Sequence, residues 1–225
     1  MVAKYTRRAD NTGWLAVRLS KTGNLVSLPE YTAVDVLREV DGRTFFKIVD
    51  GYISFGEEAS LSSASAERYL SNTGPAGAAS VVVTYNGAPS EEVSPFKGKL
   101  KQQWAELSFN GRTARVTLNS AWGGIYAPIA PGTHAILAPD FSHAKISTAG
   151  YAAATRGMVG NDVWFPIGLS GSMQNSSRYI HVGNLSEGCV TIYQLERWAA
   201  LYQYLISHRV PGSAGKRIGS LVVRK

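Results

Sequence analysis

The chain has 225 residues, a formal net charge of +7 and a hydrophobic fraction of 44%. This length suits one large domain or two small ones, and this share of apolar residues is enough to bury a core. No apolar run approaches the roughly 18 residues of a membrane span, and the charged N-terminus lacks the apolar stretch of a secretory signal. The basic balance favours polyanionic surroundings, such as nucleic acid, anionic lipid or a bacterial wall. Because the basic residues are scattered and no nucleic-acid-binding motif accompanies them, we expect no nucleic-acid partner.

The first 58 residues are predicted to form short strands separated by turns. The expected strands cover residues 14–19, 33–37, 44–49 and 52–55. Asp-Gly pairs at 41–42 and 50–51 are typical of hairpin turns, and several short strands at this spacing suggest a small barrel. The pattern resembles a bacterial SH3-like domain, a module that often binds wall peptides or glycans. The alternative is a packing module with no ligand of its own.

Residues 59–80 differ in composition, with many Ala, Ser and Gly residues and little charge. A short helix is expected over 59–71, and Pro75 and the glycines around it prevent the helix from continuing. We therefore predict a first domain over 1–58, a linker over 59–80 and a second domain over 81–225.

The second domain is also predicted to be rich in strands. The expected strands cover residues 81–85, 104–109, 114–118 and 218–223, with a loop over 89–98. Residues 126–136 are expected to turn through two prolines into a strand, and residues 163–167 form another apolar segment. Apolar residues at helical spacing predict a helix over 195–206 that packs on the sheet, and Thr191 with Gln194 fits a capping box at its start. The expected fold class is thus mostly β with one or two helices.

One stretch, residues 178–191, carries the strongest chemical signal. It contains Cys189, the only cysteine of the chain, and His181 eight positions before it. Both residues fall in expected short strands, 179–182 and 189–191, joined by a loop rich in Gly, Asn and Ser. Strand ends joined in this way can bring an imidazole and a thiol within hydrogen-bond reach, which is the pair that a thiol nucleophile needs.

This stretch resembles the catalytic domain of the L,D-transpeptidases (YkuD-type). His181 resembles the family's strand-borne histidine, and Ser-Glu-Gly-Cys at 186–189 resembles its Ser-His-Gly-Cys segment, with Glu187 in place of the second histidine. A proline-containing turn before His134 also resembles the family, so the resemblance spans roughly residues 104–192. It implies a β-rich domain with a packed C-terminal helix.

The resemblance also implies roles for individual residues. Cys189 would be the nucleophile and His181 the base, with the carbonyl of Val182 orienting the imidazole. Gly188 would let the backbone approach the substrate and expose N–H groups to an oxyanion. Candidate substrate-binding residues are Ser186, Glu187, Arg178, His134 and His143.

A zinc site is an alternative use of the same side chains. His134, His143, His181 and Cys189 are all of ligand type. Their spacing matches no compact zinc signature, so we expect no metal and no other cofactor.

Two functions follow from this pattern. The first is a peptidoglycan-modifying enzyme that acts on tetrapeptide stems through a cysteinyl acyl-enzyme. It would be an L,D-carboxypeptidase if water accepts the acyl group, and an L,D-transpeptidase or D-amino acid exchanger if an amine does. The second is a non-catalytic wall-binding protein on a degenerate transpeptidase scaffold, which the replacement of histidine by Glu187 favours.

The substrate implies where the protein acts. Peptidoglycan lies in the periplasm or cell wall, and the sequence shows no secretory signal. We therefore expect one of four routes to bring the protein there: a dedicated secretion apparatus, fusion to a delivery partner, phage lysis, or a signal that has been removed from the given sequence. An antibacterial effector injected into a rival cell, countered by an immunity protein, fits this expectation.

Overall fold

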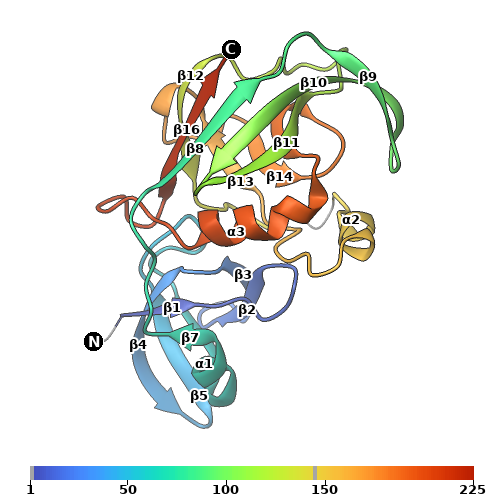
Figure 1. Ribbon diagram of the computed structural model, residues 1–225. Helices are drawn as coiled ribbons and strands as arrows, with labels where there is room; N and C mark the ends of the chain where they lie inside the picture. The colour runs from blue at the N-terminus through green and yellow to red at the C-terminus, as the bar shows by residue number, and fades with distance from the viewer. Residues whose placement is uncertain (1–2, 144–145) are drawn as a thin grey trace.

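Two β-structures stacked end to end form the molecule (Figure 1). The computed structural model describes residues 3–143 and 146–225. The prediction of a mostly β protein is confirmed. Within the described residues there are three α-helices rather than one or two. The additional helix, which was not predicted, is α2 (Ala149–Ala154).

The first structure is a seven-stranded sheet with the order β3-β2-β6-β5-β4-β1-β7. Its strands are β1 (Ala3–Thr6), β2 (Trp14–Leu19), β3 (Leu25–Pro29), β4 (Ala33–Val40), β5 (Arg43–Ile48), β6 (Glu58–Ser62) and β7 (Leu70–Ser71). Alternating residues such as Leu15, Val17 and Leu19 point into its core, as the period of a half-buried strand requires. The strand predicted over 52–55 is wrong. The chain turns there, with positive φ angles at Ser54 and at the glycines on either side of the segment.

Residues 59–80 were predicted to be a linker, but residues 59–78 carry three ordered elements, and Ala79 and Ser80 begin the next strand. These are most of β6, the helix α1 (Ser63–Tyr69) and β7. β6 pairs with β5 and β2, and β7 pairs with β1, so both strands belong to the first sheet, and α1 connects them. Ala59 and Leu61 lie in its core, which explains why this Ala- and Ser-rich stretch is ordered. The helix predicted over 59–71 is shorter, because Ser62 caps it by accepting a hydrogen bond from the Ser65 N–H.

The second structure is an eight-stranded barrel. Its strands are β8 (Ala79–Tyr85), β10 (Gly98–Phe109), β11 (Arg112–Asn119), β12 (Gly132–Leu137), β13 (Phe165–Gly168), β14 (Tyr179–Val182), β15 (Glu187–Ile192) and β16 (Arg217–Arg224). Pairing of β10 with both β8 and β11 closes the barrel. The loop predicted over 89–98 contains a further strand, β9 (Ser90–Ser94), which pairs with the first half of β10.

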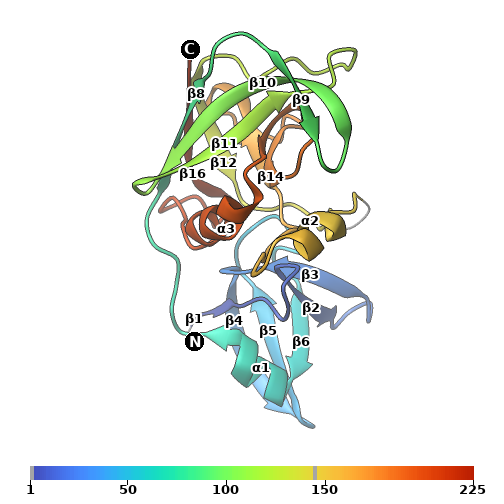
Figure 2. The same cartoon turned by 45° about the vertical axis from the view of Figure 1, so that its right-hand side comes forward.

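The helix α3, Trp198–Ile206, lies between the barrel and the first sheet (Figure 1 and Figure 2). Its residues Trp198, Leu201, Tyr202 and Leu205 are completely buried in the barrel core. The predicted capping box is wrong, because Thr191 lies inside β15 and a single 3-10 turn, Leu195–Arg197, precedes the helix.

Side chains of the first sheet also pack into the barrel. Trp14 of β2 belongs to the barrel core, and its indole N–H donates to the carbonyl of Asp162. The buried carboxylate of Glu30 accepts hydrogen bonds from Arg8 and from the hydroxyl of Tyr202 on α3, both at 2.8 Å. These contacts tie the two structures together. Among the residues described, no helix is long and apolar enough to cross a bilayer.

Candidate functional site

The strands β14 and β15 place the cysteine and the histidine side by side in the barrel wall. They pair in parallel, with Ile180 opposite Val190 and His181 opposite Thr191. In this register Cys189 lies two residues before the partner of His181, on the same face of β15 as Thr191. His181 and Cys189 both line a pocket of about 270 Å³, which we call the Cys189 pocket.

The hydrogen bonds of His181 fix its tautomer. Its Nδ1 lies 3.0 Å from the carbonyl oxygen of Val182, and its Nε2 lies 3.0 Å from the hydroxyl oxygen of Thr191. A carbonyl oxygen only accepts, so Nδ1 carries the proton and Nε2 keeps its lone pair. The Thr191 hydroxyl then donates to Nε2. Burial lowers the pKa of His181 to about 4, so the imidazole is neutral near pH 7.

A stack of aromatic rings supports this imidazole. The indole of Trp164 lies parallel to His181, with 4.1 Å between ring centroids, and parallel to His143 on its other face, at 4.3 Å. Phe141 extends the stack beyond His143. His143 therefore lies on the face of Trp164 that is turned away from His181. Its electrostatic effect also lowers the pKa of His181. Trp164 separates it from the Cys189 pocket.

Cys189 is buried, with 8% of its surface exposed. Burial raises the pKa of its thiol to about 11, although the Tyr179 backbone and the positive charge of Arg178 act in the opposite direction. Within the described part of the chain, His181 makes no hydrogen bond to the sulfur, because Thr191 occupies its Nε2. The predicted hydrogen bond between imidazole and thiol is thus absent in this state, although the two groups share a pocket.

Ser186 holds the turn that leads into Cys189. Its hydroxyl accepts from the Cys189 N–H at 3.1 Å and donates to the Cys189 carbonyl at 2.9 Å. Ser186 is 1% exposed, and its own N–H donates to the hydroxyl of Ser120. It therefore positions the cysteine backbone and has no free surface for substrate. The Cys189 N–H, an expected oxyanion donor, is already engaged.

Gly188 allows a close approach of two backbone segments. Its φ angle is +73°, and a Cβ placed there would lie 2.6 Å from the carbonyl oxygen of Ala127. The same Cβ would lie 3.2 Å from Nε of Arg178. The Arg178 guanidinium lies over the ring of Tyr126, 4.4 Å from its centroid, so its charge is held next to the cysteine.

Glu187 connects this turn to the neighbouring loop. Its carboxylate accepts a hydrogen bond of 2.9 Å from the Ile125 N–H, and a Cβ on Gly124 would overlap it. Glu187 also lines the Cys189 pocket. It is placed both to hold the loop and to give the pocket rim a negative charge.

His134 lies in a different pocket, between the segment 127–133 and Leu169. Its Nδ1 accepts from the Ser170 N–H and its Nε2 donates to the Ala130 carbonyl, each at 3.0 Å. Both ring nitrogens are engaged, so the prediction that His134 binds substrate at the cysteine has no support from its position.

No protein-family model, curated protein or solved structure matches this chain. The resemblance to L,D-transpeptidases therefore rests on the sequence alone, over roughly residues 104–192. The resemblance to SH3-like domains rests on the strand pattern of the first 58 residues.

The alternative zinc site is not supported by the positions of its four candidate ligands. Over residues 3–143 and 146–225, no three His, Cys, Asp or Glu side chains come together in a group that could hold a metal ion. His134 lies in the other pocket, and Trp164 separates His143 from His181.

Three residues of the site were not predicted from sequence. Trp164 supports the imidazole of His181, and the hydroxyl of Thr191 occupies the imidazole Nε2. Tyr151 of α2 lines the pocket. The signal for Trp164 was its place in the apolar segment 163–167, which reads equally well as core. Thr191 becomes visible only once the parallel register is known.

Proposed function

We propose that this protein is a cysteine acyltransferase or hydrolase that acts on the tetrapeptide stems of peptidoglycan. In this proposal it removes the terminal D-Ala as an L,D-carboxypeptidase, or exchanges it for another amine as an L,D-transpeptidase. The observation that carries the proposal is the shared pocket of Cys189 and His181, in which the Val182 carbonyl holds the Nδ1 proton and leaves the Nε2 lone pair as the base.

Acylation would use this tautomer directly. The Cys189 sulfur attacks the carbonyl carbon before the terminal residue while its proton passes to Nε2 of His181. The imidazolium then gives that proton to the departing amine, so that the C–N bond breaks and a thioester remains. Water or an amine next attacks the thioester carbonyl carbon while His181 takes a proton from the attacking group. The C–S bond then breaks, and His181 passes this proton to the departing sulfur, which restores the thiol.

The resting state must change for this step to occur. Nε2 of His181 has to exchange the Thr191 hydroxyl for the thiol, and the pKa of Cys189 near 11 means that the thiol enters the reaction protonated. The proton would therefore leave during attack rather than before it. The nearby charge of Arg178 favours the developing thiolate.

Location and partners are part of the same proposal. The substrate lies in the bacterial periplasm or wall, so delivery would require a secretion apparatus or another export route, and an immunity protein would protect the producer. The first sheet would act as an SH3-like module that holds wall material.

The test uses a soluble disaccharide-tetrapeptide, with and without a large excess of a different D-amino acid. Mass analysis should show the tripeptide product, the exchanged tetrapeptide, or both, with the wild-type protein. Cys189→Ala should abolish both products while preserving the fold, since it removes a single sulfur atom. Equal turnover by wild type and Cys189→Ala would refute the proposal.

A second candidate function is wall binding without catalysis. It is favoured by the resting geometry, in which the thiol is buried and protonated and His181 is bonded to Thr191. This function expects sedimentation with purified sacculi and no mass change in the tetrapeptide. Binding that is unaffected by Cys189→Ala, together with absent turnover in wild type, would select it.

A further inference from the structure

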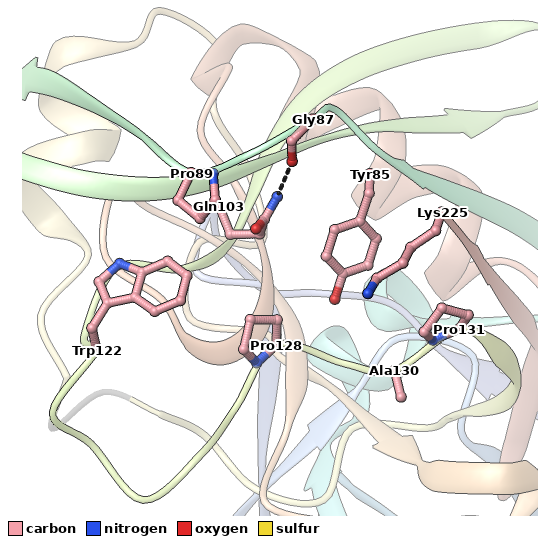
Figure 3. A pocket seen from close by; sticks show the side chains of 9 residues that line it. All are labelled: Tyr85, Gly87, Pro89, Gln103, Trp122, Pro128, Ala130, Pro131 and Lys225. Carbon is pink, nitrogen blue, oxygen red and sulfur yellow. Dashed lines mark hydrogen bonds between the residues drawn. The ribbon is translucent and has the colours of Figure 1, made fainter.

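A second pocket lies in the barrel wall, outside the cysteine site (Figure 3). Its volume is about 590 Å³, more than twice the 270 Å³ of the Cys189 pocket. We call it the Trp122 pocket, and its walls include Tyr85, Gln103, Trp122, Pro128, Pro131 and Lys225. None of these residues takes part in the chemistry proposed above.

Two aromatic rings of this pocket are held in place by their polar atoms. The indole N–H of Trp122 donates to the carbonyl of Lys101 at 2.6 Å, and the hydroxyl of Tyr85 donates to the carbonyl of Ile129 at 2.7 Å. Both donors are therefore used within the protein. What the rings offer to a ligand is their apolar surface, and Trp122 is 45% exposed.

Gln103 gives the pocket a fixed hydrogen-bond acceptor. Its amide nitrogen donates to the carbonyls of Gly87 and Trp104 at 3.1 and 3.3 Å, which assigns the other amide atom as oxygen. Figure 3 shows that oxygen turned away from Gly87 and toward Pro128. Gln103 is only 6% exposed, and within the described residues its oxygen has no hydrogen-bond partner. This oxygen keeps some exposed surface, so a ligand donor that enters the pocket can bind it in place of water.

These features select one ligand chemistry over another. A proline-rich peptide offers carbonyl acceptors and needs N–H or O–H donors from its aromatic groove. Here the donors of Trp122 and Tyr85 are already engaged, and the proline rings have no N–H to give. A sugar ring instead has apolar C–H faces for the rings, and hydroxyl or acetamido N–H donors for the Gln103 oxygen. The Lys225 ammonium, near the ring of Tyr85, adds a donor for an acetamido carbonyl.

We propose that the Trp122 pocket binds an N-acetylhexosamine unit of a glycan strand. That this glycan belongs to peptidoglycan rests on the proposed function. One loop links the two sites, because Ala121 lines the Cys189 pocket and Trp122 lines this one. A glycan held at Trp122 would thus keep its stem peptide next to Cys189.

The direct test is a titration of the full-length protein with triacetylchitotriose, a glycan without a stem peptide. Trp122 is the one exposed tryptophan of five, so binding should change the intrinsic fluorescence. Because Trp122→Ala also removes this reporter, its affinity and that of the wild type are compared by isothermal titration calorimetry. We expect the variant to bind about tenfold or more weakly, the usual effect of removing a central aromatic contact. The matched control is Phe55→Ala, which removes an exposed aromatic ring from the region of the first sheet and should not change binding.

A second variant and two further ligands sharpen the test. Gln103→Leu should weaken binding as well, and cellotriose, which lacks the acetamido group, should bind more weakly than triacetylchitotriose.

NMR shift changes in the wild-type protein should map to residues of the Trp122 pocket, whether or not a variant folds. Binding of a polyproline peptide in place of either sugar, or sugar binding unchanged in Trp122→Ala, would overturn the proposal.

Turnover separates this inference from the proposed function. Trp122→Ala should raise KM for the disaccharide-tetrapeptide and leave turnover of the sugar-free tetrapeptide unchanged. Turnover without any triacetylchitotriose binding would refute the glycan site alone. Sugar binding at Trp122 with no turnover in wild type would refute the proposed function alone.

Discussion

The Nε2 atom of His181 and the hydroxyl oxygen of Thr191 lie 3.0 Å apart, across the parallel strands β14 and β15. The hydroxyl is completely buried and holds the position that a thiol must take to give up its proton. Thr191 thus positions the imidazole while it competes with Cys189 for the same lone pair.

Replacing Thr191 by valine keeps the shape of the side chain and removes this competitor. We expect Thr191→Val to lower stability by about 1–2 kcal/mol, because it leaves Nε2 of His181 buried without a partner. We also expect faster alkylation of Cys189 at neutral pH, because the freed lone pair can accept the thiol proton. Thr191→Ser keeps the hydroxyl and serves as the control. An unchanged alkylation rate in Thr191→Val would show that the hydroxyl does not restrain the thiol.

The buried thiol should react slowly at neutral pH. With a pKa of about 11, Cys189 is almost entirely protonated at pH 7, and the thiolate is the species that reacts. The rate of iodoacetamide labelling should therefore rise about tenfold per pH unit from pH 7 to pH 9. Peptide mass analysis at each pH gives the rate. A rate that is already constant below pH 7 would mean that a thiolate–imidazolium pair exists without substrate.

The neutral state of His181 should make stability depend on pH. Its folded pKa of about 4 lies below the ordinary value of about 6.5, so between these values the unfolded chain binds more protons. Stability from this residue is present above pH 6.5 and is lost as the pH falls toward 4. From pH 7 to pH 5 the loss should be about 2 kcal/mol.

Urea unfolding at pH 7 and pH 5 measures this loss, with His181→Asn as the reference because its amide still donates to the Val182 carbonyl. The decrease in stability between the two pH values should be smaller in the variant. The same decrease in both proteins would assign the pH dependence to other groups.

The contact between Tyr202 and Glu30 should stabilise the junction of the first sheet with the barrel. Tyr202→Phe removes a buried 2.8 Å hydrogen bond to a carboxylate, and we expect a loss of about 2 kcal/mol. Tyr204→Phe is the matched control on the same helix, because its hydroxyl bonds to the exposed backbone of Ser80. Equal effects of the two variants in thermal unfolding would mean that the Glu30 contact adds nothing.

The sequence pattern is sufficient to predict where several strands lie, but it does not predict which strands pair. Alternation and turn signals locate β2, β5 and β8, because half-buried strands need a period of two. Closure of the barrel by β10 and β11 depends on contacts between distant segments, which local pattern does not encode. The turn at 52–55 has strand-like residues, yet the conformations of its flanking glycines prevail.

The same reason limits what the sequence says about the site. The spacing of His181 and Cys189 indicates a pair, and the structure places both in one pocket. Which side chain meets the imidazole depends on the register of two parallel strands, and a shift of two residues exchanges Cys189 for Thr191. Gln103 gave no signal, because a glutamine in a strand is unremarkable until both its nitrogen contacts and its free oxygen are known.

The position of Trp164 between two parallel imidazoles has an optical consequence. Protonation of His181 puts a cation against one face of the indole, with 4.1 Å between the ring centroids. Such a charge perturbs the excited state of the ring and quenches its emission. The fluorescence of Trp164 therefore reports the charge at this site without an added label.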